Sequence, residues 1–366
     1  MKKSNTENRK LDHIEICINE NVCANVTAGF EEVSLIHNAI PELDLDEIDT
    51  KTYFFGKKID YPIMFAAITG GHETTKIINE NIAIVAEKLN IPVGIGSQRA
   101  ALEDERLKNT YKTVRDIAPS VFLVGNVGIS QIINDGTNIV KKSIEMIDAD
   151  AIAIHCNVLQ ELIQPEGDRK FRGALSALSK IVESVNVPVI VKEIGSGISS
   201  DVAKKLKDIG ISGIDVGGLG GTSWAAVEYY RTKSLTDDKN LRLGESFWDW
   251  GISTAISIFE TKNAISESMN LIATGGIHSG QDIAKSIALG ADVAATAGHI
   301  LGSAQKSDKV LLDTLNLMMS ELKYSMLLTG SKTINELKIT NLVVSGKTAE
   351  WLNARGYNTS NLARRS

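Results

Sequence analysis

Short apolar runs bounded by Gly, Asn and Pro recur eight times along the chain, and each predicts a buried strand. The runs cover residues 61–70, 92–98, 121–128, 151–157, 188–197, 213–220, 270–277 and 293–301. Between them lie stretches with apolar residues at helical spacing, such as 73–90, 201–210 and 279–290. Strands that are apolar throughout, rather than at alternate positions, are typical of a parallel sheet covered on both faces.

A strand followed by a helix, repeated eight times, predicts an α/β fold of the (β/α)8 barrel type, the TIM barrel. An open, doubly wound sheet is the alternative, because it uses the same alternation without closure. We expect one domain over residues 1–366, with an N-terminal extension (1–60), the barrel (61–301) and a C-terminal helical segment (302–366). Residues 221–251 are expected to form a long loop, and their aromatic side chains favour a lid over a disordered loop.

Composition narrows the functional classes. A formal net charge of -6 argues against a nucleic-acid-binding surface as the main function. The three cysteines show no metal-binding spacing, and their odd number argues for a reducing compartment. The first residues lack an apolar leader, and no run approaches the ~18 apolar residues of a membrane span. We therefore expect a soluble, cytoplasmic protein with no nucleic-acid or membrane partner.

Polar side chains of several kinds stand at the end of the fourth apolar run and shortly after it. They are His155, Asn157, Gln160, Glu161 and Gln164. Four other runs each carry or precede one further polar residue. These are Ser97, Asn126, Lys192 and Thr222. Because barrel enzymes carry their chemistry at the carboxyl ends of the strands, this distribution predicts a site there.

Lys192 and two glycine-rich segments indicate what such a site could bind. Burying a lysine in an apolar strand costs free energy of folding unless its charge has a partner. Lys192 therefore either faces a ligand or pairs with a barrel carboxylate. The segments ATGGIHSG (273–280) and ATAGHILG (295–302) follow the seventh and eighth runs, where barrels commonly bind phosphate. Tight-turn packing is the alternative explanation for these glycines.

The motifs NRKxxH, TGG, GSQR, HxNxxQExxQPEG, VKE, GGTxW, FxDWGIxTAxSIxE and GGIxSGxDxAKxIALGAD occur in this order over nearly the whole chain. This set resembles the type 2 isopentenyl diphosphate isomerases, which are FMN-dependent. The resemblance implies an FMN-bearing barrel that interconverts isopentenyl and dimethylallyl diphosphate by a 1,3-allylic proton shift. It further implies a reduced flavin with NADPH as reductant, Mg²⁺ at the diphosphate, and a homo-oligomer, either a tetramer or an octamer.

The resemblance also assigns residues by position. Those expected to bind FMN are Ala67, Ile68, Thr69, Ser97, Asn126, Lys192, Thr222, Gly275, Gly276, Ile277, Thr296 and Ala297. Those expected to bind the substrate are Arg9, Lys10, His13, Ser97, Gln98, Arg99, Asn157 and Gln160. Catalytic roles are expected for Gln160, His155, Lys192 and Trp224, and Mg²⁺ is expected at Glu161.

An amide at Gln160 stands where protonation of an alkene would call for a carboxylic acid. We therefore hypothesise that reduced FMN transfers the proton, with Lys192 tuning the flavin and Trp224 covering the hydrocarbon. Trp224 could instead only anchor its loop. The chain departs from the family pattern at His278, where arginine is common, and at Gly217, where a preceding serine is often found.

Three other functions remain as alternatives. A 2-hydroxy-acid oxidase would need a His-Gly-x-Arg group after the sixth run, where this chain has GGLGGTSW. An enzyme similar to inosine monophosphate dehydrogenase would need a catalytic cysteine in a barrel loop, whereas Cys156 lies at a strand end. A flavin-binding barrel without turnover would have no need of Arg9, Lys10, Gln160 and Glu161.

Overall fold

The computed structural model describes residues 5–233 and 238–365, and its centre is a closed barrel of parallel strands. In chain order the strands are β4 (Ile63–Phe65), β5 (Val93–Gly94), β6 (Leu123–Gly128), β7 (Ala151–Cys156), β8 (Val189–Glu193), β9 (Gly213–Asp215), β10 (Asn270–Thr274) and β11 (Val293–Thr296). The last strand closes on the first, with Ala294 opposite Ile63. The predicted (β/α)8 fold is therefore confirmed, and the open sheet is excluded.

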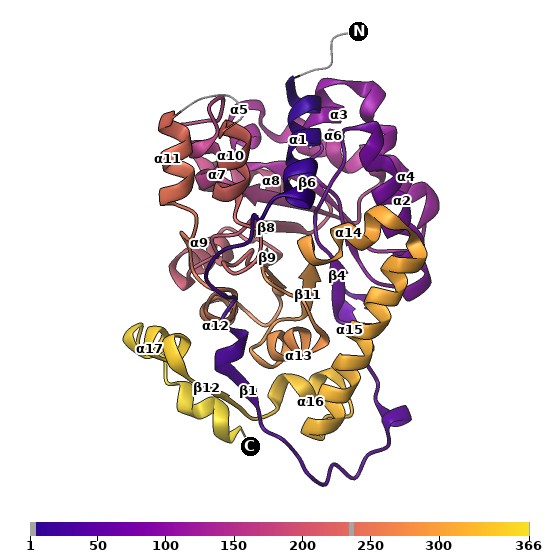
Figure 1. Cartoon of the computed structure of the whole chain (residues 1–366), viewed down its shortest axis with the longest axis vertical. Helices are drawn as coiled ribbons and strands as arrows, with labels where there is room; N and C mark the ends of the chain where they lie inside the picture. Colours follow the sequence, from indigo (N-terminus) through magenta and orange to yellow (C-terminus); the bar gives the residue numbers. More distant parts are fainter. Residues whose placement is uncertain (1–4, 234–237, 366) are drawn as a thin grey trace.

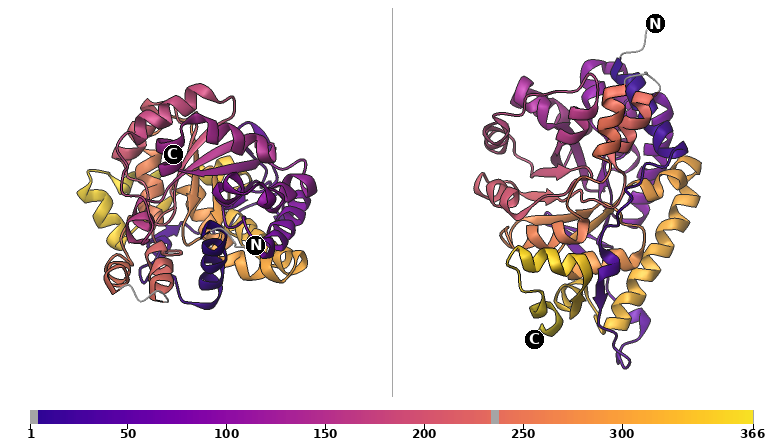
Figure 2. Two further views of the ribbon diagram at one scale, coloured as in Figure 1. Left: turned by 90° about the horizontal axis from the view of Figure 1, so that it is seen from above. Right: turned by 60° about the vertical axis from the view of Figure 1, so that its left-hand side comes forward.

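Helices surround the strands, as the view from above in Figure 2 shows. The helices that follow the strands are α2 (Glu73–Leu89), α4 (Asn109–Ile117), α6 (Thr137–Ile147), α8 (Ala174–Ser184), α9 (Ser200–Asp208), α12 (Thr254–Lys262), α13 (Gly280–Ala288) and α15 (Asp308–Thr329). Several begin at serine caps: Ser199 accepts from the backbone of Val202, and Ser279 from that of Asp282. Such caps satisfy amide groups that the first helical turn leaves unpaired.

The barrel interior is a packed apolar core that is closed at the amino ends of the strands. A hairpin of β2 (Thr52–Phe54) and β3 (Lys57–Ile59) covers this end. Phe54 is fully buried there, and its ring lies 5.1 Å from that of Phe122. Because this end is plugged with aromatic side chains, space for a ligand is left at the carboxyl ends of the strands.

Additional helices gather at those carboxyl ends. They are α1 (Asn5–Asn19), α3 (Arg99–Glu103), α5 (Ile129–Asp135), α7 (Val158–Ile163), α10 (Trp224–Lys233), α11 (Asp238–Ser246) and α14 (Gly298–Lys306). Figure 1 shows α1 at the top of the molecule beside α10, with which it is packed.

Two sequence-based predictions about this end are wrong. Most of residues 221–251 is not a loop, because α10 and α11 occupy it and pack against each other; residues 234–237 lie outside the described ranges. The eighth strand ends at Thr296, and residues 298–301 already belong to α14. Helix α10 is buried on several sides, so its sequence shows no clear period, and α14 follows β11 after a single residue, Ala297. Sequence pattern alone does not resolve such boundaries.

The C-terminal segment is mostly helical, as predicted, and it also contains a strand. After α15 come α16 (Ile334–Ile339), β12 (Leu342–Val344) and α17 (Gly346–Ala354), at the end of the molecule opposite α1 (Figure 1). Strand β12 pairs antiparallel with β1 (Val33–Leu35) of the N-terminal extension. Buried Glu260 of α12 accepts hydrogen bonds from Trp351 and Arg355 at 3.0 Å each, which fixes α17 to the barrel.

None of the helices in the described ranges has the length and apolar character needed to cross a bilayer.

Candidate functional site

A cavity of about 460 Å³ opens at the carboxyl ends of the barrel strands, with α1 forming part of its wall. This volume lies within the range of small-molecule sites, roughly 300–1,000 Å³. Most of the predicted site residues line it: Arg9, Lys10, His13, Ala67, Ile68, Thr69, Ser97, Arg99, Asn126, His155, Asn157, Gln160, Glu161, Lys192, Thr222, Trp224, Gly275, Gly276, Ile277 and Ala297.

Gln98 and Thr296 are the two predicted site residues that do not line the cavity. Gln98 is fully buried; its amide nitrogen donates to the Ser143 carbonyl at 2.8 Å, and its amide oxygen accepts from the Asn126 backbone at 3.0 Å. Thr296 is also buried and donates to the Ile277 carbonyl at 3.1 Å. Gln98 therefore joins two strand ends, and Thr296 fixes the segment after β10.

A carboxylate that the sequence analysis did not single out organises one wall of the cavity. Glu228 of α10 is fully buried, and one of its oxygens accepts from His13 Nε2 at 2.9 Å and Gln160 Nε2 at 3.0 Å. Its other oxygen accepts from Arg231 Nε at 2.7 Å. Burial alone would raise the pKa of Glu228, but His13, Arg231 and Gln160 outweigh that effect and hold the pKa at about 2. Glu228 is therefore ionised.

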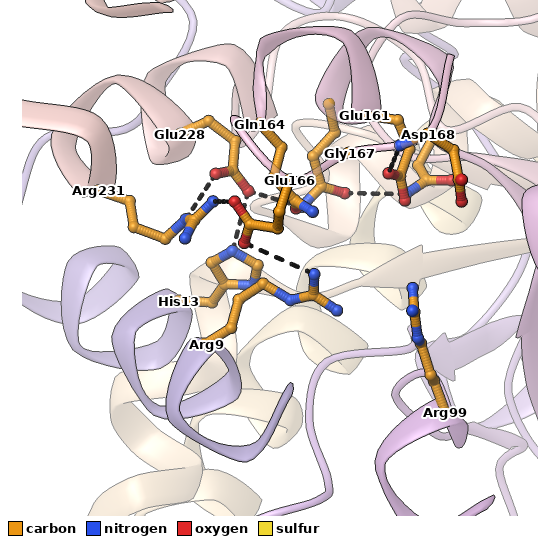
Figure 3. Close-up of polar contacts among 12 residues, drawn as sticks. Arg9, His13, Arg99, Glu161, Gln164, Glu166, Gly167, Asp168, Glu228 and Arg231 are labelled. Atoms are coloured by element: carbon orange, nitrogen blue, oxygen red, sulfur yellow. Dashed lines mark hydrogen bonds and ion pairs between the residues drawn. The ribbon is translucent and has the colours of Figure 1, made fainter. Parts of the chain in front are cut away.

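A second carboxylate continues this cluster toward solvent. Glu166 accepts from Arg231 at 2.9 Å, and its other oxygen lies 3.8 Å from Arg9. Figure 3 shows Arg9 and His13 of α1 beside Glu166 and Glu228, with Arg231 joining the two carboxylates. The side chain of Glu166 is 48% exposed and that of Glu228 is fully buried, so the two carboxylates mark the rim and the inside of this wall.

Cationic side chains face the cavity from two elements. Arg9 and Lys10 come from α1 and Arg99 from α3, and all three line the cavity. Burial lowers the pKa of Lys10 to about 8, and the neighbouring Arg9 and Arg99 add to this lowering. Among the described side chains, no ion pair is formed by Lys10. Arg9 and Arg99 each have one carboxylate nearby, Glu166 at 3.8 Å and Glu103 at 2.8 Å. Three neighbouring cations with only these two partly exposed carboxylates are suited to bind a multiply charged anion.

His155 is held neutral in one orientation at the end of β7. Burial lowers its pKa to about 3, and Lys10 and Lys192 add to this effect. Asn126 Nδ2 donates to the Ile95 carbonyl at 3.1 Å, so Asn126 Oδ1 accepts from His155 Nδ1 at 2.8 Å. The proton is therefore on Nδ1, and His155 Nε2 is left as a hydrogen-bond acceptor.

Lys192 both lines the cavity and forms a buried ion pair. Its ammonium lies 3.2 Å from Asp215 on the adjacent strand β9 and donates to the Glu193 carbonyl at 2.9 Å. The side chains of Lys192 and Asp215 are only 9% and 8% exposed. Of the two explanations for a strand lysine, ligand contact and pairing with a barrel carboxylate, the structure shows the second and leaves room for the first.

We expect Asp215→Asn to destabilise the protein by about 3–5 kcal/mol, because Lys192 would remain buried without its counter-charge. Urea unfolding followed by circular dichroism measures this. The matched control is Glu267→Gln, which removes one partner of the exposed Lys262–Glu267 pair and should leave the unfolding midpoint unchanged. Equal midpoints for Asp215→Asn and the unmodified protein would contradict the expectation.

The region around Glu161 combines amide and carboxylate groups. Asn157 Nδ2 donates to Glu161 at 3.0 Å and to Gln160 Oε1 at 3.3 Å, while the backbone of Asp168 donates to the other Glu161 oxygen at 2.8 Å. This loop passes so close that a Cβ on Gly167 would lie 2.0 Å from the Glu161 carbonyl, so only glycine fits there. Asn157 Oδ1 is buried without a hydrogen-bond partner.

Metal binding at Glu161 would need ligands from outside the chain. Within the described ranges, no three His, Cys, Asp or Glu side chains are grouped as a metal site. Mg²⁺ commonly takes one or two protein carboxylates and completes its shell with water and substrate phosphates. Glu161 could be the one protein carboxylate of such a site, with water and a substrate phosphate as the other ligands.

The glycine-rich end of the cavity has the features of a phosphate site. Gly275 and Gly276 have φ of 111° and 67°, which favour glycine, and α14 begins at Gly298 on the cavity wall. Among the cavity-lining residues, Thr69 and Thr274 have buried hydroxyl oxygens without hydrogen-bond partners. Unsatisfied polar atoms and backbone amides at this end fit the ring and phosphate of a flavin mononucleotide.

Several polar residues that matter for this cavity are not among those predicted from the sequence. They are Glu228, Arg231, Glu166 and His299. A signal for Glu228 exists in the segment WAAVEYYR, where a carboxylate stands among apolar and aromatic residues and would require buried partners. No local pattern indicates that these partners are His13 and Gln160, which lie 215 and 68 positions away along the chain.

Comparison with known proteins places this geometry among flavoproteins. Residues 146–344 match the model of a family described as FMN-dependent dehydrogenase. Isopentenyl-diphosphate delta-isomerase of Methanosarcina mazei is 47% identical over 359 residues, covering 98% of this chain and 97% of the relative. The isopentenyl-diphosphate delta-isomerase of Archaeoglobus fulgidus is 46% identical over 351 residues, covering 96% and 99%.

Solved structures share the fold at low sequence identity. A lactate oxidase of Pediococcus acidilactici aligns with a TM-score of 0.66 and 16% identity, covering 92% of this chain and 90% of the oxidase. A mandelate oxidase with a monooxide FMN adduct aligns with a TM-score of 0.61 and 16% identity, covering 94% of each chain. At this identity the likeness establishes the barrel architecture alone.

Proposed function

We propose that this chain, which belongs to the type 2, FMN-dependent isopentenyl-diphosphate delta-isomerase family, interconverts isopentenyl and dimethylallyl diphosphate. One observation carries the proposal: a single cavity joins a phosphate site for the flavin after β10 and β11 to a separate group of three cations on α1 and α3. A cofactor phosphate and a substrate diphosphate can therefore be held at different places in the same cavity.

FMN, with NADPH as its reductant, would supply the acid and base for the proton shift when it is bound in reduced form. The residues of the chain hold the two ligands and set their surroundings. Lys192 presents a positive charge to the cavity, which favours an electron-rich ring. Asn126 and His155 add one hydrogen-bonding pair, and burial, which holds the pKa of His155 at about 3, keeps this ring neutral.

Arg9, Lys10 and Arg99 would bind the diphosphate, and Glu161 would hold Mg²⁺, which would supply further positive charge for the diphosphate. Gln160 would then face the reacting carbons. Its amide nitrogen points to Glu228 and its oxygen accepts from Asn157, so its orientation is fixed from both sides. A fixed neutral amide contacts the hydrocarbon without competing for the transferred proton.

Trp224 closes the hydrocarbon side of the cavity. Its ring meets that of His13 edge-on, with centroids 5.3 Å apart, and His13 is in turn held by Glu228. An aromatic face at this position would exclude water and stabilise positive charge that develops on the substrate carbons. The same contact with α1 also makes Trp224 an anchor, so both roles considered from the sequence are compatible.

An oxidase of 2-hydroxy acids is disfavoured despite the shared fold. The segment after β9 lines the cavity with Gly217, Gly218, Gly221 and Thr222. None of these can serve as a base or as a cationic clamp for a carboxylate. Hydride removal from a hydroxy acid would therefore lack both groups at the position where such an enzyme needs them.

The direct test incubates the full-length protein with isopentenyl diphosphate, FMN, Mg²⁺ and either NADPH or dithionite in D₂O. NMR should show dimethylallyl diphosphate and deuterium uptake only while the flavin is reduced. Omitting Mg²⁺, or changing Glu161 to Gln, should lower the rate at limiting substrate. Reduced flavin bound by the protein without any substrate conversion would contradict the proposed function.

The pH dependence of substrate binding gives a second test. Because the pKa of Lys10 is about 8, its charge is present below pH 8 and is lost as the pH rises through 8. Diphosphate favours the charged form, so the KM should be flat near pH 7 and rise by about tenfold between pH 8 and 9.5. Lys10→Arg keeps the charge and should remove this rise; the same rise in the variant would contradict the assignment.

We further propose a cytoplasmic homo-oligomer, either a tetramer or an octamer. Its three cysteines are free, as suits a reducing compartment. Leu317, Tyr324 and Leu328 of α15 are 63%, 53% and 48% exposed, which provides apolar surface for a second copy. Light scattering of the purified protein would measure the assembly, and a monomer at micromolar concentration would contradict it.

A further inference from the structure

Two histidines stand together at the glycine-rich end of the cavity. His278 follows Gly276 in the segment after β10, and His299 is the second residue of α14. Their ring centroids are 5.3 Å apart, with planes inclined by 33°, and both side chains line the cavity. Two imidazoles at this distance would repel each other if both were protonated without an anion between or beside them.

The position of the pair is the place where a barrel binds phosphate. Barrels commonly form such a site from the loops after the seventh and eighth strands together with a helix N-terminus. Here those loops follow β10 and β11, the helix is α14, and Thr274 adds a buried hydroxyl without a hydrogen-bond partner. Among the described residues of these two segments that line the cavity, His278 and His299 are the ionisable ones.

The surroundings of the pair contain charges of both signs. Asp282 of α13 accepts from the His278 backbone at 3.0 Å, and Glu321 of α15 accepts from the Gly280 backbone at 2.6 Å. Burial lowers the pKa of His299 and His278 lowers it further, while Asp282 and Glu321 act in the opposite direction. On α2, which also packs against α14, the residue bonded to α14 is the uncharged Asn81.

We propose that His278 and His299 bind the FMN phosphate as a pair of proton-dependent cations, so that this protein holds FMN more weakly as the pH rises. The inference rests on the proposed function only in that FMN occupies this cavity. A phosphate dianion beside the two rings favours the charged form of each, so binding takes up protons. Affinity therefore declines through the pH range in which the bound pair would lose those protons.

The experiment starts from the full-length protein loaded with FMN. Samples are equilibrated between pH 6.5 and 8.5, and free FMN is measured by fluorescence after ultrafiltration. Over this range the phosphate is mostly dianionic, since its second pKa is about 6. The Kd should rise by about tenfold, which corresponds to a shift of one pKa unit on binding. Riboflavin, which lacks the phosphate, should show no such rise.

Variants separate the histidine pair from other titrating groups. His278→Gln combined with His299→Gln should bind FMN more weakly at pH 6.5 and show a flat profile, whereas His278→Arg should keep tight binding at pH 8.5. His37→Gln changes an exposed histidine of the N-terminal extension and should behave as the unmodified protein. His278 and His299 are both exposed residues, so the substitutions should leave the fold intact.

Two results would overturn the inference: a double variant with the unmodified pH profile, or a riboflavin profile that rises like that of FMN. The isomerase assay at saturating FMN tests the proposed function separately. Isomerisation together with a Kd for FMN that does not change with pH would overturn only the proposed role of the histidine pair. A Kd for FMN that rises with pH, without isomerisation, would support the role of the histidine pair and overturn only the proposed function.

Discussion

Glu228→Gln should lower the turnover number by about a hundredfold or more and change the KM much less. The substitution keeps the shape of the side chain and removes a charge that has three partners, His13, Gln160 and Arg231. As a carboxylate, Glu228 can only accept hydrogen bonds, so it fixes the Gln160 amide with its nitrogen toward Glu228. A glutamine in its place can donate as well as accept, so the Gln160 amide would lose its single orientation. Misplacing one group at the reacting carbons can lower the turnover number about a hundredfold.

The kinetic effect must be separated from a loss of stability, because Arg231 would keep a buried charge without this carboxylate. Turnover at saturating FMN and substrate should therefore be measured below the unfolding midpoint of each variant. Glu166→Gln is the matched control, since Glu166 also pairs with Arg231 but has a side chain that is 48% exposed. It should change turnover by less than about threefold. Unaltered turnover in Glu228→Gln would show that the orientation of Gln160 does not depend on this carboxylate.

The barrel was predictable because its determinants are local and repeated. Each strand is a short run of apolar residues, and the helices between them carry polar and apolar positions at helical spacing, so eight independent signals agree. Helix α10 was not predictable in the same way. It buries Ala225, Val227 and Glu228 on different sides, so no polar face marks its period.

The sequence predicted which strand ends form the candidate site. It predicted less well which side chains at those ends point into the cavity. Gln98 immediately precedes Arg99 and ends a predicted strand, yet its side chain turns to Ser143 while Arg99 lines the cavity. The direction is set where the backbone turns from β5 into α3, and the sequence pattern of a strand does not extend through such a turn. Glu228 was missed because its partners are distant in the chain.

Replacing Arg9 and Arg99 together by Gln should lower kcat/KM by about a thousandfold. Each guanidinium lines the cavity, one from α1 and one from α3, and a charged hydrogen bond to a phosphate oxygen contributes about 1.5–3 kcal/mol. The diphosphate lies away from the reacting carbons, so part of this binding energy holds the hydrocarbon against the flavin. The double variant should therefore lose turnover as well as affinity.

Stability should change little in this variant, which makes the kinetic result interpretable. Arg99 pairs with Glu103 on its own short helix, with side chains that are 36% and 40% exposed, and Arg9 lies 3.8 Å from the half-exposed Glu166. Arg106→Gln, at a side chain that is 61% exposed, controls for loss of positive charge elsewhere. The KM of the unmodified protein should also rise with salt, and less steeply in the double variant. A double variant with unaltered kcat/KM and salt dependence would contradict the assignment of Arg9 and Arg99 to the diphosphate.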